Sequence, residues 1–111
     1  MNEIYKNKVV LVTGASRGIG KAIAYKFASQ GAYVLGTATT EESAQKISNN
    51  FKKKKFLGIG FELNVAKKSS IEQFEKNIKD SYAPNILINN AGITRDNLLM
   101  RMKDDEWEDV I

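Results

Sequence analysis

The sequence predicts an α/β fold, a doubly wound parallel sheet of about four strands with helices on both faces. Short apolar, β-branched runs alternate with stretches whose apolar residues repeat at helical spacing. A glycine-rich turn follows the first apolar run, and neither an internal repeat nor a linker interrupts the alternation. Parallel strands need crossover connections, so this order predicts right-handed strand–helix–strand units in a single domain of 111 residues.

The first unit joins a strand, a glycine-rich turn and a helix. Residues 8–12 suit a strand that is buried on both faces. The following apolar residues predict a helix over residues 18–30; they are Ile19, Ala22, Ile23 and Phe27. Gly31 fits the left-handed position that ends a helix. The free N–H groups of this helix would point at the glycine turn, where we expect a phosphate, although the glycines could also form no more than a turn.

Three further strands are predicted over residues 33–37, 56–61 and 85–88. Two helices lie between them, each with the spacing of a capping box at its start. Thr39 and Glu42 form the first such pair, and Ser69 and Glu72 form the second. Pro84 marks the end of the second helix.

The C-terminal stretch carries two more expectations. A last helix is expected to begin between residues 103 and 106, and the sequence ends inside it at residue 111. The strand over residues 85–88 would then lie at an open edge of the sheet, where exposed apolar strands promote aggregation.

The composition excludes several kinds of chemistry. Cysteine and histidine are both absent, so disulfides, thiolate catalysis and a histidine base are excluded, and no metal site is expected. No apolar stretch is long enough for a membrane, and the N-terminus lacks the order of a signal peptide, which predicts a cytoplasmic protein. The net charge of +4 includes four lysines at residues 52–55, which we interpret as a solvated loop or helix end. No nucleic-acid partner is expected, because neither interleaved aromatic residues nor a recognition helix accompanies this charge.

The candidate site lies at the carboxyl ends of the strands, where parallel sheets of this kind bind their ligands. Four turns are expected to meet at this edge, over residues 14–20, 37–40, 64–65 and 89–92. The glycines of the first turn match neither the G-x-G-x-x-G pattern nor a P-loop, because Ala15 and Ala22 stand where a P-loop needs Gly and Ser or Thr.

The spacing Thr-Gly-x-x-x-Gly-x-Gly over residues 13–20 is instead similar to the first motif of the short-chain dehydrogenase/reductases. Residues 89–92, Asn-Asn-Ala-Gly, resemble the second motif of that family, in the proper order and after the proper strand. The resemblance implies the N-terminal half of a Rossmann-like fold.

One branch of that family is similar over essentially the whole chain, on residues 13–20, 36–39, 63–65 and 90–102. It comprises the beta-ketoacyl-acyl-carrier-protein reductases of bacterial type II fatty acid synthesis. The resemblance implies NADPH-dependent reduction of a beta-ketoacyl thioester and a substrate linked to acyl-carrier protein. The family commonly forms homotetramers through later helices, so the oligomeric state of this chain stays open.

The charge pattern favours NADP over NAD. NAD sites want an acid at the end of the second strand to bind the ribose 2′-hydroxyl, but here the first acid is Glu41. A 2′-phosphate would suit Arg17 and the hydroxyl of Thr39. Arg17 could also be an ordinary exposed arginine, and Thr39 could be only a helix cap.

Thirteen residues are predicted to bind the cofactor. They are Gly14, Ala15, Ser16, Arg17, Gly18, Ile19, Gly20, Thr39, Asn64, Val65, Asn90, Ala91 and Gly92. By the resemblance, Asn64 and Val65 lie beside the adenine and Asn90 lies near the adenine-side ribose. Considered without it, the asparagines are also ordinary turn residues.

No catalytic residue is expected in this chain. The family uses a later Ser, a Tyr-x-x-x-Lys pair and an Asn in the fourth helix, whereas none of the four tyrosines here is followed by Lys at the required position. The chain is therefore expected to be a partial NADP-binding domain, truncated at its C-terminus and inactive alone. Two alternatives stay open, namely another reductase of the superfamily with a different ketone or alcohol substrate, and a non-catalytic nucleotide-binding module.

Overall fold

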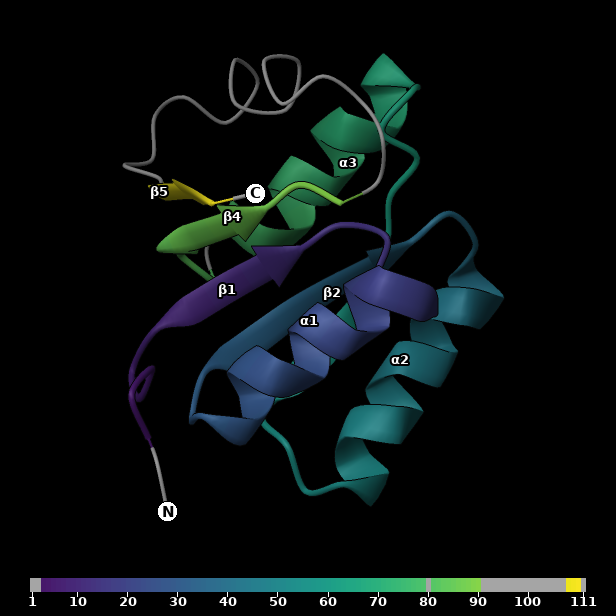
Figure 1. The fold of residues 1–111 in the computed structure, drawn as a ribbon. Helices are drawn as coiled ribbons and strands as arrows, with labels where there is room; N and C mark the ends of the chain where they lie inside the picture. Colours follow the sequence, from purple (N-terminus) through teal and green to yellow (C-terminus); the bar gives the residue numbers. More distant parts are fainter. Residues whose placement is uncertain (1–2, 80, 91–107, 111) are drawn as a thin grey trace.

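The computed structural model describes residues 3–79, 81–90 and 108–110. Its parallel strands form one sheet in the order β3-β2-β1-β4-β5 (Figure 1). The strands are β1 (Val9–Val12), β2 (Tyr33–Ala38), β3 (Gly58–Glu62), β4 (Ile86–Ile88) and β5 (Glu108–Val110). The helices are α1 (Gly18–Ser29), α2 (Glu41–Lys53) and α3 (Lys68–Lys79).

The sheet separates two layers of core. Side chains alternate along a strand, so Val10 and Val12 of β1 pack in one layer and Leu11 packs in the other. Helices α1 and α2 cover the first layer, and α3 covers the second (Figure 1). All three of these β1 side chains are completely buried. The predicted α/β fold with helices on both faces is confirmed.

Helix α2 packs unusually close to β3 because two positions of that strand are glycines. A Cβ at Gly60 would lie 2.1 Å from the Ala44 carbonyl oxygen, and one at Gly58 would lie 2.5 Å from Cδ2 of Phe51. Side chains at these positions would push α2 away from β3. The packing around Phe51, which is only 1% exposed, would then be lost.

Two predicted helix starts need correction. The N-cap of α2 is Thr40, not Thr39, and its side chain accepts a hydrogen bond from the Ser43 N–H at 3.1 Å. Strand β2 extends to Ala38, one residue further than predicted, which moves the cap along the chain. Helix α3 begins at Lys68, so Ser69 lies inside its first turn and is not its cap.

The C-terminal expectations are also corrected where the structure describes the chain. Glu108–Val110 form strand β5 and not a helix, and they pair in parallel with β4. Strand β4 is therefore not at the sheet edge. The physical reason is that every backbone N–H and C=O of a strand needs a hydrogen-bond partner. Strand β5 supplies these partners along the edge of β4 that was predicted to be open. The rest of the predicted last helix lies outside the described residues.

Aromatic rings pack where the strands begin. The rings of Tyr5 and Phe27 pack at a tilt with centroids 4.8 Å apart, and Tyr33 stacks on Tyr82 at 5.4 Å. The two hydroxyls of the second pair lie 3.3 Å apart. Burial, together with this hydrogen bond, raises the pKa of Tyr33 from 10.0 to about 12.

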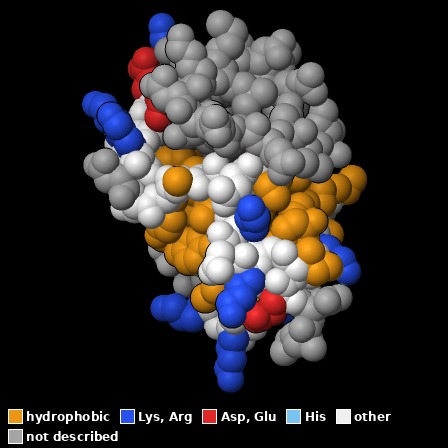
Figure 2. All heavy atoms as spheres, turned by 90° about the vertical axis from the view of Figure 1, so that its left-hand side faces the viewer, with side chains coloured by type: hydrophobic (Ala, Val, Ile, Leu, Met, Phe, Trp, Pro, Cys, Tyr) orange, Lys and Arg blue, Asp and Glu red, His pale blue; other side chains and the backbone are white. Residues whose placement is uncertain are grey.

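The lysine run lies at this same end of the sheet. All four lysines at residues 52–55 are exposed, as predicted. Lys54 and Lys55 line a shallow hollow with Gly31 and Leu57, next to the starts of β2 and β3. Figure 2 views the molecule from the side where β1 begins, and basic side chains project at the lower end of this face. Among the described helices, none is long and apolar enough to cross a membrane.

Candidate functional site

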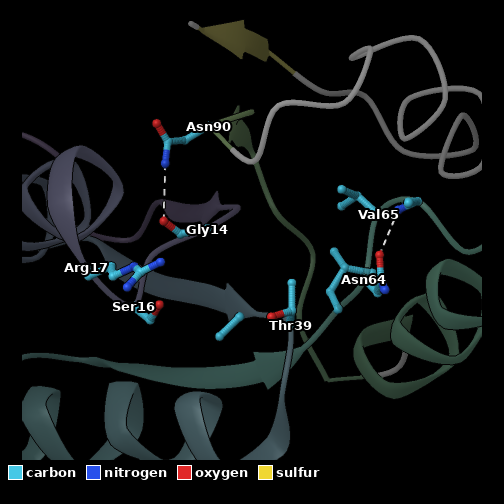
Figure 3. A pocket seen from close by; sticks show the side chains of 10 residues that line it. Gly14, Ser16, Arg17, Thr39, Asn64, Val65 and Asn90 are labelled. Carbon is cyan, nitrogen blue, oxygen red and sulfur yellow. Dashed lines mark hydrogen bonds between the residues drawn. The ribbon is translucent and has the colours of Figure 1, made fainter.

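Turns at the carboxyl ends of β1, β2, β3 and β4 surround a pocket of about 470 Å³ (Figure 3). Seven of the predicted cofactor-binding residues line it: Gly14, Ser16, Arg17, Thr39, Asn64, Val65 and Asn90. Ala38, Leu63 and Ala66 also line it. None of the three was among the predicted cofactor-binding residues, although Ala38 lies in the predicted turn over residues 37–40 and Leu63 in the segment 63–65 that resembles the family branch. Ala66 was missed because it is apolar and lies outside every predicted turn.

The other predicted residues do not line the pocket or cannot be placed. Ala15 is buried behind the turn, and Gly18 and Ile19 are exposed at the start of α1. Ile19 is 73% exposed, so it lies outside the packed face of the helix. The buried residues of that face are the small residues Gly20, Ala24 and Ala28. Ala91 and Gly92 lie outside the described residues.

The glycine turn begins with a residue, Gly14, whose backbone is held from two neighbouring strands. The Gly14 N–H donates to the Thr37 hydroxyl at 3.2 Å, and the Ala15 N–H donates to the Thr37 carbonyl at 2.8 Å. From the other side, Nδ2 of Asn90 donates to the Gly14 carbonyl at 3.2 Å (Figure 3). Gly14 has a φ of +63°, a left-handed conformation that favours glycine.

The turn also packs tightly on the first residues of α1. A Cβ at Gly20 would lie 1.9 Å from the Gly14 carbonyl oxygen and 2.5 Å from Nδ2 of Asn90. Only glycine fits there. This contact brings the N-terminus of α1 directly against the turn.

That N-terminus is suited to an anion. Its N-cap, Arg17, has extended backbone and no capping hydrogen bond from its side chain, and the first turn of α1 contains no acidic residue. The first N–H groups of a helix have no acceptor within the helix, and they carry the positive end of its dipole. The described lining of the pocket adds one cation, Arg17, and no carboxylate.

On the far side of the pocket, the turn after β3 is fixed by two hydrogen bonds of Asn64. Its N–H donates to the Ser70 hydroxyl at 2.8 Å. Its Oδ1 accepts from the Ala66 N–H at 3.0 Å (Figure 3). The side-chain oxygen of Asn64 is therefore used within the turn, as in the turn-residue interpretation, while Asn64 also lines the pocket.

The turn after β4 is fixed to β1. The Asn90 N–H donates to the Thr13 hydroxyl at 2.9 Å, and the Thr13 N–H donates to the Ile88 carbonyl at 3.0 Å. The two sequence motifs, far apart along the chain, thus contact each other through Thr13, Gly14 and Asn90. Within the described part of the chain, no group of three or more acidic side chains could hold a metal ion.

Comparison with known proteins agrees with this geometry. The family model described as short chain dehydrogenase matches residues 8–111. The chain belongs to this family. Its members include three relatives named 3-oxoacyl-[acyl-carrier-protein] reductase FabG, from Haemophilus influenzae, Escherichia coli and Vibrio harveyi, to which the chain is 53%, 54% and 56% identical. Each match covers 96% of this short chain dehydrogenase sequence but only 43% of the relative.

Proposed function

We propose that this chain is the N-terminal, cofactor-binding part of an NADPH-dependent 3-oxoacyl-acyl-carrier-protein reductase of fatty acid synthesis. The observation that carries the proposal is the 53–56% identity to such reductases over 96% of the chain. The pocket supports it, since the two family motifs meet at one edge of the sheet. A cytoplasmic location and an acyl-carrier-protein-linked substrate are parts of the same proposal.

The residues that are present suit a phosphate-bearing cofactor. Gly20 leaves room for the turn to lie against α1, whose first N–H groups would bind the pyrophosphate together with the turn of residues 14–20. Asn64 and Val65 would contact the adenine, and Asn90 would lie near the adenine-side ribose. Ala91 and Gly92 stay predicted cofactor-binding residues.

The preference for NADPH over NADH rests on charge at the end of β2. Arg17 and Thr39 line the pocket there, and a guanidinium and a hydroxyl suit a 2′-phosphate. The nearest acids along the chain, Glu41 and Glu42, line a different hollow with Gln45, Lys46 and Asn49. No carboxylate of the described pocket lining would repel the 2′-phosphate.

The chain would bind the cofactor without using it. Bound NADPH supplies the hydride that reduces a keto carbon, and this chain's part is to hold the adenine half in place. The groups that donate the proton and orient the carbonyl would belong to a segment beyond residue 111. We therefore propose that these 111 residues alone do not reduce substrate.

Calorimetric titration of the purified chain with NADPH and NADH tests the proposal. NADPH is expected to bind at least about tenfold more tightly, because only it carries the 2′-phosphate. Equal affinities would contradict the preference for NADP. If neither NADPH nor NADH bound, the proposed cofactor site would be contradicted. Turnover of a ketoacyl thioester by the chain would contradict the proposal that the chain binds the cofactor but does not reduce substrate alone. Reading the coding sequence beyond codon 111 for a Ser and a Tyr-x-x-x-Lys pair is the direct check on the family branch.

A further inference from the structure

The end of β2 contacts the glycine turn through a residue that lies in the predicted turn over residues 37–40 but is not among the thirteen predicted cofactor-binding residues. Thr37 is 1% exposed, and it does not line the pocket in the described part of the chain. It nevertheless accepts two hydrogen bonds from the turn. Its hydroxyl accepts from the Gly14 N–H at 3.2 Å, and its carbonyl accepts from the Ala15 N–H at 2.8 Å.

These two bonds are of different kinds. Any residue at this position has a backbone carbonyl that can accept from the Ala15 N–H. Only Ser or Thr has a hydroxyl on Cβ, close enough to the backbone to accept from the Gly14 N–H. Without that hydroxyl, the Gly14 N–H would lose its acceptor in a partly buried place. A buried donor without a partner is costly, so the turn would move to satisfy it.

The position of the Gly14 backbone determines where the rest of the turn lies. Its N–H is held by Thr37 and its carbonyl by Asn90, from β2 and β4 respectively. The same carbonyl oxygen packs against Gly20 in the first turn of α1. A shift of this residue would therefore displace the turn relative to the helix N-terminus.

We propose that Thr37 is a positioning residue for the cofactor phosphates, acting through its hydroxyl on the Gly14 peptide. The proposal rests on the proposed NADPH site. Thr37 itself contacts no ligand. It holds the glycine turn in the one conformation that presents its later amides and the start of α1 to the pyrophosphate.

The test compares Thr37→Val, which keeps the shape and removes the hydroxyl, with Thr37→Ser, which keeps the hydroxyl. Two ligands are titrated into each, namely NADPH and adenosine 2′-monophosphate, which lacks the pyrophosphate. The valine variant is expected to bind NADPH about tenfold more weakly and adenosine 2′-monophosphate less than about twofold more weakly. The serine variant is expected to bind both within about threefold of the unsubstituted chain.

An equal loss for both ligands in the valine variant, accompanied by a lower melting temperature, would overturn the proposal in favour of a purely stabilising role. Unchanged NADPH binding would overturn it as well.

A second measurement does not depend on how the valine variant folds. In the unsubstituted chain without ligand, the Gly14 amide is expected to exchange its hydrogen at least about 100-fold more slowly than an unstructured peptide. Rapid exchange would overturn the proposal. If the unsubstituted chain bound no NADPH while Gly14 was protected, the proposed function would fail and the hydrogen bond from Gly14 to Thr37 would stand.

Discussion

The two ends of the parallel strands are held together by different interactions. At the carboxyl ends, hydroxyls and amides of side chains accept and donate hydrogen bonds with the backbone of neighbouring turns, as Thr13, Thr37 and Asn90 do. At the amino ends, aromatic rings such as the pair Tyr33 and Tyr82 pack on one another, and Lys54 and Lys55 line a hollow beside the starts of β2 and β3.

The difference reflects what each end must leave available. Hydrogen bonds fix the position of a turn with few atoms, so the space beyond the strands stays open for a ligand. Ring packing fills the space and excludes water, which stabilises the fold but leaves no room for a site. Substitutions at the carboxyl ends should therefore affect binding most, and those at the amino ends should affect stability alone.

Gly20→Ala should have the largest effect. The new Cβ would lie 1.9 Å from the backbone oxygen of Gly14, so the turn and α1 must separate. We expect loss of measurable NADPH binding and a lower melting temperature in calorimetry. Gly18→Ala, in the same proposed phosphate-binding turn, tests backbone strain without a steric clash, because a Cβ there meets no atom within 4 Å while its φ of +63° makes the substitution strained by about 1–2 kcal/mol. NADPH affinity within about twofold in the Gly20 variant would contradict the close packing of the turn.

Phe51→Ala should test the amino end. The side chain is 1% exposed and packs against Tyr25 with ring centroids 5.9 Å apart, so its removal should lower the free energy of unfolding by about 3–5 kcal/mol. Below the melting temperature, NADPH affinity should change by less than about twofold. Denaturant unfolding measures the first quantity and calorimetric titration the second. Leu57→Ala, at a side chain that is 60% exposed, should change stability by no more than about 0.5 kcal/mol. A parallel loss of binding in the Phe51 variant would show that the two ends are coupled.

Arg17→Gln should weaken NADPH binding about tenfold and leave NADH binding and the melting temperature unchanged, because the exposed guanidinium caps nothing in α1. Lys21→Gln is the control. Lys21 lies one turn further along α1, with Nζ 5.5 Å from the centre of the Tyr25 ring, and it does not line the pocket. If both substitutions weakened NADPH binding equally, Arg17 would act only through its positive charge and not through a specific contact with the 2′-phosphate.

Two adjacent threonines should separate binding from stability at a single turn. Thr40→Ala removes the cap that accepts from the Ser43 N–H, and should lower the free energy of unfolding by about 1 kcal/mol. Thr39→Ala should leave stability unchanged and weaken NADPH binding about threefold, since Thr39 lines the pocket. Chemical denaturation and titration of both variants measure the contrast, and a reversal of the two results would restore Thr39 as the helix cap.

Stability at high pH should depend on the hydroxyl of Tyr33. The folded chain raises the pKa of Tyr33 from 10.0 to about 12, so the folded state keeps this proton more tightly than the unfolded state. The resulting stabilisation is fully present below pH 10.0 and is lost as the pH rises towards about 12. Tyr33→Phe should remove this part of the pH dependence, while the titration of the lysines remains in both proteins. If the free energy of unfolding depended on pH identically in the two proteins, the raised pKa of Tyr33 would be contradicted.

The fold was predictable from the sequence because the strands of a buried parallel sheet are continuous apolar runs. Residues 8–12 and 85–88 were correctly identified as strands, with ends that differ from the structure by one residue. The pattern could not reveal β5, because Glu108 and Asp109 are acidic and the stretch around them has helical composition. Pairing with β4, a contact between distant parts of the chain, outweighs that local preference.

The location of the candidate site was predictable for a different reason. The carboxyl ends of parallel strands meet at one edge, so the motifs at residues 13–20 and 89–92 had to come together once the strand order was assumed. The supporting contacts were not predictable. Thr37 and Ser70 reach the turns only through hydrogen bonds, and no spacing along the sequence distinguishes them from other hydroxyl residues.

The central place of β1 in the sheet also sets an order of assembly. The hydrogen bond from Gly14 to Thr37 closes 23 positions of chain, whereas the one from Asn90 to Gly14 closes 76. Longer closures lose more chain entropy and form later, so β2 should join β1 well before β4 does. During synthesis from the N-terminus, the glycine turn would acquire its first partner early and its last only when residue 90 has been made. Binding of the cofactor to a growing chain would therefore show that β4 has joined β1 through the crossover that contains α3.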